Sequence, residues 1–312
     1  MQRKIILDAD PGHDDAIAIL LAANSPEIDL LGITTVAGNQ TLEKTTLNAR
    51  RVCSVAGIKV PIARGMDRPM VRRQIIAANI HGDSGLDGPA FGDPTVDVIG
   101  MHAVNFIIET LRKSEGDITL VPTGPLTNIA MALQLAPDIR EKVQEIIFMG
   151  GAYGFGNTTP GAEFNIYADP EAAKVVLHSG IPLTMVGLDL THQATATPDV
   201  LEKIKAIDTP LANTVVELLE FFSKTYYEVF GFPAPPVHDP CTIAKIIDPG
   251  VFTTKHVYVD VDTKSELNYG RTVCDFYGVL DKRPNCHVAI DLDKDRFWQL
   301  VIKAVERYKP AV

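Results

Sequence analysis

The chain has 312 residues, with 29 Lys and Arg against 39 Asp and Glu, so its formal net charge is −10. A polymer of phosphates prefers a basic surface, so this charge argues against a nucleic-acid partner. Apolar residues make up 46% of the chain and charged residues 22%, close to the globular average, which excludes long disorder and collagen-like repeats.

Strands and helices are predicted to alternate along the chain. The predicted strands are Lys4–Leu7, Asp29–Val36, Lys59–Ala63, Asp117–Val121, Glu145–Met149 and Pro182–Leu188. The predicted helices are Ala16–Ala23, Thr41–Ala56, Met101–Leu111, Leu126–Leu135, Pro170–His178 and the aromatic-rich Leu211–Phe230. The final elements are strands at Lys255–Val261, Arg271–Tyr277 and Asn285–Ile290 and a helix at Arg296–Tyr308. This order predicts one doubly wound α/β domain over residues 1–312: a mostly parallel sheet, helices on both faces and a few added C-terminal strands.

One long segment lacks a clear period. Arg64–Val98 is rich in Gly and Pro and contains His81-Gly-Asp-Ser-Gly-Leu-Asp-Gly88. Long irregular loops in compact domains are often lids or binding loops, so we expect a functional role.

The compartment is predicted from three absences in the sequence. No apolar run approaches the roughly 20 residues of a membrane span. The start of the chain has three apolar residues after two basic ones, too few for a signal-peptide core. The four cysteines are scattered and show no CxxC spacing; they are Cys53, Cys241, Cys274 and Cys286. We therefore expect a cytoplasmic protein with free thiols and no membrane partner.

Polar residues gather where the predicted strands end, which is where open α/β sheets bind ligands. They are Asp8, Asp10, His13, Asp14, Asp15, Asn39, Thr123, Asn157, Glu163 and Asn165, with His238-Asp239 just before a helical pattern. Crowded carboxylates repel one another and need a cation, and oxygen donors without thiols or histidine pairs favour Ca²⁺ or Mg²⁺ over zinc. Asp10 and Asp15 stand five residues apart across a Pro-Gly turn, so both can converge on one ion.

Simpler interpretations stand beside this one. Asp14 and Asp15 can cap the helix that follows them. The asparagines can serve turns, above all Asn157 in its turn-like context. Glu163 and Asn165 have period-two spacing, which in an extended segment would point both side chains the same way and favours a shared role.

Six ordered motifs over nearly the whole chain resemble the inosine–uridine-preferring nucleoside hydrolase family. They are Asp8-Ala-Asp-Pro-Gly-His-Asp-Asp15, Val36-Ala-Gly-Asn39, Val121-Pro-Thr-Gly-Pro-Leu-Thr-Asn128, Met149-Gly-Gly-Ala152, Ala162-Glu-Phe-Asn-Ile-Tyr-Ala-Asp-Pro-Glu171 and Val237-His-Asp239. The resemblance implies hydrolysis of the N-glycosidic bond of ribonucleosides to ribose and free base. Departure of the base builds an oxocarbenium-like sugar cation, which a rim of carboxylates and amide oxygens stabilises.

The resemblance also implies roles for individual residues. Ca²⁺ would be held by Asp10, Asp15, the backbone carbonyl of Thr123 and Asp239, together with a water and two ribose hydroxyls. Asp10 would be the general base that deprotonates this water. The implied substrate-binding residues are Asp14, Asn39, Asn157, Glu163, Phe164, Asn165, Tyr226, Phe230 and Asp239. Bonds to the ribose hydroxyls predict discrimination against deoxyribonucleosides.

Recognition of the base is expected to involve two histidines. His81 and His238 resemble the pair of the pyrimidine-preferring group, where a proton donor assists the leaving base; the alternative is that both only line the pocket. No constellation is visible around His13, His102, His178, His192, His256 or His287.

Aromatic residues add to this expectation. Tyr226, Tyr227 and Phe230 are expected to wall the base site, although Phe230 stands where related enzymes often carry a tyrosine. The single tryptophan, Trp298, lies near the C-terminus, which favours pyrimidines over purines because purine-preferring relatives stack the base on tryptophans. Uridine and cytidine are therefore the favoured substrates, with inosine also considered.

Two other functions fit parts of the sequence. Asp8-x-Asp10 after a strand is superficially similar to metal-dependent phosphohydrolases of the haloacid dehalogenase type, but Pro11-Gly-His follows where that class places a hydroxyl residue. A non-catalytic nucleoside-binding protein is the second alternative, although the chain keeps both the general base and the metal set. Family members are commonly homodimers or homotetramers and are linked to nucleoside salvage. We therefore expect a homodimer or homotetramer with a role in nucleoside salvage.

Overall fold

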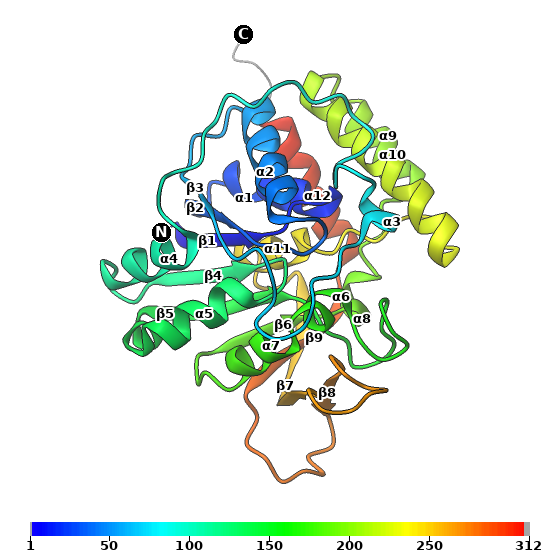
Figure 1. Ribbon diagram of the computed structural model, residues 1–312. Coiled ribbons are helices and arrows are strands. Elements are labelled where there is room, and N and C mark those ends of the chain that lie inside the picture. Colours follow the sequence, from blue (N-terminus) through cyan, green and yellow to red (C-terminus); the bar gives the residue numbers. More distant parts are fainter. Residues whose placement is uncertain (1, 309–312) are drawn as a thin grey trace.

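The computed structural model describes residues 2–308, which build a nine-stranded sheet (Figure 1). Its strands, in chain order, are β1 Arg3–Ala9, β2 Ile28–Thr35, β3 Ile62–Arg64, β4 Ile118–Pro122, β5 Val143–Met149, β6 Leu183–Val186, β7 Phe252–Val261, β8 Thr272–Asp275 and β9 Cys286–Leu292. They lie in the order β3-β2-β1-β4-β5-β6-β9-β7-β8. In this spatial order, all neighbouring strands from β3 through β9 pair in parallel. Strand β7 pairs antiparallel with both β9 and β8.

Helices cover both faces of this sheet. One face carries α1 His13–Ala23, α2 Leu42–Ala56, α9 Pro198–Lys205, α10 Pro210–Phe230, α11 Pro240–Ile247 and α12 Lys294–Glu306. The other carries α4 Ala103–Arg112, α5 Thr127–Leu135 and α7 Pro170–Leu177. Strand β1 shows why the sheet needs both layers: Ile5 and Leu7 enter the first core and Ile6 the second, since side chains alternate along a strand. The predicted fold class is confirmed.

The remaining helical elements are short: α3 Ala78–His81, α6 Phe164–Ala168, α8 Leu188–Thr191 and the 3₁₀ turn η1 Pro137–Lys142. Helix α3 interrupts the long segment after β3 and packs beside α10, from where the chain passes around α2 to reach α4 (Figure 1). The predicted functional loop therefore holds a helix turn that ends at His81.

Two local predictions need correction. Helix α1 begins at His13, three residues earlier than predicted, because the acidic motif itself forms the first turn. The extended segment considered for Glu163 and Asn165 is not formed: Glu163 is the N-cap of α6, and its carboxylate accepts the main-chain N–H of Asn165 and Ile166. The carboxylate of Glu163 therefore serves two backbone donors at a helix start, which the period-two pattern did not indicate.

The four cysteines are free, and three of them are buried, with Cys274 half-buried. Within residues 2–308, no helix has both the length and the apolar character required to cross a bilayer.

Candidate active site

A cavity of about 360 Å³ opens at the carboxyl ends of the parallel strands. Strand β1 lies between β2 and β4, so the chain reverses its winding direction at this point, which is where doubly wound sheets bind ligands. The residues predicted to form the site line the cavity, except Asp10 and Asp15, which are wholly buried, and Tyr227, which is not among the lining residues. The lining set comprises Asp14, Asn39, His81, Thr123, Asn157, Glu163, Phe164, Asn165, Tyr226, Phe230, His238 and Asp239.

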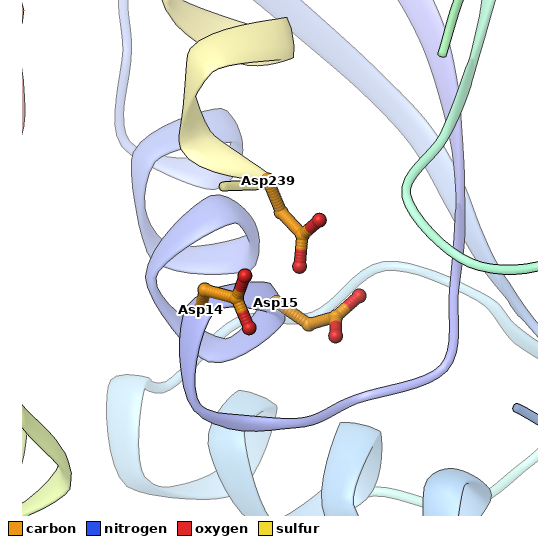
Figure 2. Close-up of side chains that lie close together, drawn as sticks. All are labelled: Asp14, Asp15 and Asp239. Carbon is orange, nitrogen blue, oxygen red and sulfur yellow. The ribbon is translucent and has the colours of Figure 1, made fainter. Parts of the chain in front are cut away.

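Three carboxylates meet at the inner end of the cavity. Asp14 and Asp15 project from the first turn of α1, and Asp239 extends toward them from the start of α11 (Figure 2). Each offers an oxygen atom, and these three oxygens lie within 4.8 Å of one another. Helices α1 and α11 pack side by side, so two acidic segments more than 200 residues apart converge. Such a group of oxygen donors can hold a metal ion.

Asp10 lies beside this group and is fixed by the loop after β2. Its Oδ2 accepts the main-chain N–H of Asn39 at 2.7 Å, and its Oδ1 has no hydrogen-bond partner among the described residues. Gly38 and Gly124 both abut its carboxylate, where a Cβ at either position would overlap an oxygen of Asp10. An unpartnered carboxylate oxygen buried among other acids is costly unless a cation faces it.

Asp15 combines the two roles considered from the sequence. Its Oδ2 accepts the N–H of Gly12, the N-cap of α1, at 3.0 Å, so the helix-capping interpretation is correct for this residue. Its Oδ1 accepts the hydroxyl of Thr123 at 2.8 Å, which ties α1 to the end of β4. The capping bond therefore also fixes the carboxylate beside Asp14 and Asp239.

Burial sets the protonation of the cluster. It raises the pKa of Asp14 to about 7, with a further contribution from the charge of Asp15. The pKa values of Asp10 and Asp239 are raised well above the usual range, first by burial and then by the neighbouring acids. Without a cation the cluster therefore retains protons, and a bound cation would favour the ionised form.

Amide and carboxylate groups line the side of the cavity next to β5. Asn165 donates from Nδ2 to the carbonyl oxygen of Thr123 at 2.7 Å, so it orients a predicted metal ligand. Glu163 also accepts the N–H of Gly151 at 2.8 Å, and burial raises its pKa to about 7. Asn157 accepts the N–H of Phe164 at 2.9 Å, so the turn role considered for it is present while the residue also lines the cavity.

The outer part of the cavity is aromatic. His238 is bonded through Nε2 to the hydroxyl of Tyr226 at 2.6 Å and through Nδ1 to Thr191 at 2.7 Å. Phe230 lines the mouth, whereas Tyr227 points to solvent with 67% of its surface exposed, so its predicted place in the wall is wrong. The two tyrosines are neighbours on α10, and a helix turns consecutive residues about 100° apart. The indole N–H of Trp298 donates a hydrogen bond to the carbonyl oxygen of Thr195, and Trp298 does not line the cavity.

The sequence match is decisive for the family. The model of the inosine-uridine preferring nucleoside hydrolases matches residues 5–299. The chain belongs to this family. It is 54% identical to the pyrimidine-specific ribonucleoside hydrolase RihB of an Escherichia coli strain over 307 residues, which covers 98% of both chains.

Solved structures of nucleoside hydrolases share the fold. A purine-preferring ribonucleoside hydrolase from Gardnerella vaginalis superposes with a TM-score of 0.91 at 33% identity, covering 98% of both chains. An inosine-guanosine nucleoside hydrolase superposes with a TM-score of 0.90 at 28% identity, covering 98% of this chain and 99% of that one. Membership in a nucleoside hydrolase family argues against the phosphohydrolase alternative.

No role was predicted from the sequence for three residues in or beside this cavity. His13 stacks on His81 inside the protein, although no partner was visible for it. Its place in the acidic motif was the available signal. Thr191 and Arg72 carried no signal, because each reaches the site from a segment outside the six motifs. Arg72 is the single Lys or Arg among the cavity residues, and its guanidinium lies 4.0 Å from the ring centre of Tyr167.

Proposed function

We propose that this chain is a Ca²⁺-dependent ribonucleoside hydrolase that prefers pyrimidine ribonucleosides and releases ribose and the free base. The observation that carries the proposal is the group of buried carboxylates of Asp14, Asp15 and Asp239 at the inner end of a cavity large enough for a nucleoside. The 54% identity to a pyrimidine-specific relative supports the base preference.

The residues present suit a Ca²⁺ ion. Asp15, Asp239, the carbonyl of Thr123 and the unpartnered Oδ1 of Asp10 would hold it, all of them hard oxygen donors. Asp14 belongs to the same group of three carboxylates as Asp15 and Asp239, so its oxygen lies close to the proposed position of the ion. When bound, the ion would supply positive charge that orients the attacking water and the ribose hydroxyls and makes that water more acidic.

The chain's own groups would then divide the chemistry between them. Asp10 would take a proton from the attacking water, a role that suits a carboxylate fixed by the Asn39 N–H and otherwise unpartnered. Asp14, Asn39, Asn157, Glu163, Asn165 and Asp239 would bind the ribose, and their oxygen atoms would stabilise the developing sugar cation.

The base would lie between His81, Phe164, Tyr226, Phe230 and His238, which line the outer cavity. Burial lowers the pKa values of His81 and His238 well below the ordinary histidine value, so both rings are neutral in the free site and bind a proton weakly. A ring that binds a proton weakly gives it up readily, as a leaving-group acid must.

We also propose that the chain forms one domain and works as a cytoplasmic homo-oligomer in nucleoside salvage. The single domain rests on the order of the predicted elements and the location on the sequence features given above, whereas the oligomer and the salvage role rest on the family resemblance.

The experiment is incubation with uridine and Ca²⁺, with measurement of free ribose and uracil. We expect both products in equal amounts, and their loss in EDTA with recovery on Ca²⁺ addition. Asp239→Asn should lose at least about 10³-fold in kcat, whereas Asp208→Asn serves as the control, because Asp208 has a φ of 54° that asparagine tolerates. Tight binding of uridine without ribose release would support a nucleoside-binding protein instead.

A further inference from the structure

His13 is a buried histidine that the reaction scheme above does not use. It is the first residue of α1 and has no exposed surface. Its ring stacks on Phe221 and Phe222 of α10, with centroid distances of 5.2 and 5.3 Å and interplanar angles of 3°. His81 stacks on the same Phe222 at 5.3 Å. The two histidines thus occupy one aromatic stack between α1, α3 and α10.

One ring nitrogen of His13 is hydrogen-bonded to the loop after α3. Nε2 lies 2.8 Å from the carbonyl oxygen of Asp87. A carbonyl oxygen can only accept, so the single proton of the neutral His13 ring resides on Nε2. Nδ1 of His13 is therefore left with a lone pair, available as an acceptor.

His13 faces Nδ1 of His81 with two different groups. Its main-chain N–H lies 3.3 Å from that atom, and its own Nδ1 lies 3.2 Å from it. One group is a donor and the other an acceptor, so Nδ1 of His81 has a partner whether it is bare or protonated. Gly12 permits this approach, since a Cβ there would lie 2.5 Å from Nδ1 of His81.

The other nitrogen of His81 is left for the cavity. His81 lines the cavity, and within residues 2–308 both polar contacts of its ring end at Nδ1. We propose that His13 is a positioning residue that holds Nδ1 of His81 in either proton state, so that Nε2 is the atom presented to the base of a bound nucleoside. This inference rests on the proposed hydrolase function and on a leaving-group role for His81.

The proton balance explains why both groups of His13 matter. A His81 ring that has taken a proton from bulk water carries one on each nitrogen. As the glycosidic bond breaks, the Nε2 proton passes to the departing base, which leaves as a neutral molecule. The ring that remains is neutral and keeps its Nδ1–H bond to Nδ1 of His13. The bare-Nδ1 tautomer is instead met by the His13 main-chain N–H.

The test is a matched pair of variants, His13→Asn and His13→Gln. Asparagine places a polar atom near the position of Nδ1 of His13, whereas glutamine places one near Nε2 and leaves the Nδ1 position empty. Each is assayed with uridine and with p-nitrophenyl β-ribofuranoside, whose leaving group needs no proton. We expect His13→Gln to lower kcat/KM for uridine about 30-fold and for the nitrophenyl riboside less than about 3-fold, with His13→Asn close to wild type on both.

Combination with His81→Ala shows whether His13 acts through His81. In that background His13→Gln should change kcat/KM for uridine by less than about 2-fold, since the ring it positions is gone. An equal loss on both substrates, an additive loss in the His81→Ala background, or equal behaviour of the two His13 variants would overturn the inference. Failure of the proposed function gives a different result, because wild type would then release no ribose, or His81→Ala would leave uridine cleavage unchanged.

Discussion

The phenol oxygen of Tyr226 lies 2.6 Å from Nε2 of His238, and the hydroxyl of Thr191 lies 2.7 Å from Nδ1 of the same ring. Both nitrogens of His238 are therefore engaged within the protein, and His238 and Tyr226 both line the cavity. A proton from His238 would reach a bound base through the Tyr226 hydroxyl.

Tyr226→Phe tests this path directly. The variant keeps the ring that packs against Phe222 but removes the hydroxyl. We expect kcat/KM for uridine to fall about 10-fold to 100-fold and kcat/KM for p-nitrophenyl β-ribofuranoside to change less than about 3-fold. Tyr227→Phe, on the solvent side of the same helix, is the matched control. Similar losses on both substrates would contradict a role in protonating the base.

Gly38 is predicted to be required for activity. A methyl group at this position would overlap Oδ2 of Asp10 and displace the general base or the loop that bonds to it. Gly38→Ala should lower kcat at least about 100-fold, because small displacements of catalytic groups are costly. Gly92→Ala is the control, since a Cβ there meets nothing within 4 Å, and steady-state kinetics on uridine distinguish them. Full activity of Gly38→Ala would show that Asp10 need not be held where it lies.

Stability without a cation is expected to fall as the pH rises. The folded protein holds the pKa of Asp14 at about 7, above its ordinary value of 3.8, and those of Asp10 and Asp239 are also raised. A carboxyl with a raised folded-state pKa stabilises the fold below its unfolded pKa, and this contribution is lost as the pH rises through the folded pKa. The loss should run from about pH 4 to beyond pH 7.

Calcium should remove most of this dependence, because it binds the ionised carboxylates. Melting temperatures in EDTA and in Ca²⁺ at pH 5 and pH 8 provide the measurement. We expect Ca²⁺ to raise Tm more at pH 8, with a stabilisation of about 2.7 kcal/mol at 100 times Kd. Asp239→Asn should reduce the shift. If Ca²⁺ raises Tm equally at both pH values, the cluster is not the group that binds it.

Ribonucleosides should be strongly preferred over deoxyribonucleosides. The cavity floor offers carboxylate and amide groups from Asp14, Asn39, Asn165 and Asp239, which suit ribose hydroxyls. Loss of one hydroxyl leaves buried polar groups unpaired, so kcat/KM for 2′-deoxyuridine should be at least about 100-fold below that for uridine. Equal values for the two substrates would be incompatible with this use of the floor.

The sequence by itself was sufficient to predict the sheet and most of the residues that line the cavity. A parallel sheet is buried on both faces, so its strands appear in the sequence as apolar runs, which helical patterns separate. Strands such as β1 and β4 could therefore be predicted within a few residues. The acids of the first motif and His238-Asp239 were found because polar residues at strand ends and before a helix meet at one rim. Those signals are local in the chain.

Only the tertiary structure decided how these residues use their atoms. The packing of α3 on α10 brings His13 and His81 within hydrogen-bond distance, and the chain separation of 68 residues hides that contact from any spacing rule. Likewise, the carboxylate of Glu163 accepts backbone N–H groups because α6 starts there. The period-two spacing of Glu163 and Asn165 did not indicate this role. Side chains satisfy buried donors and acceptors from whichever segment lies nearest in space, and the fold alone determines which segment that is.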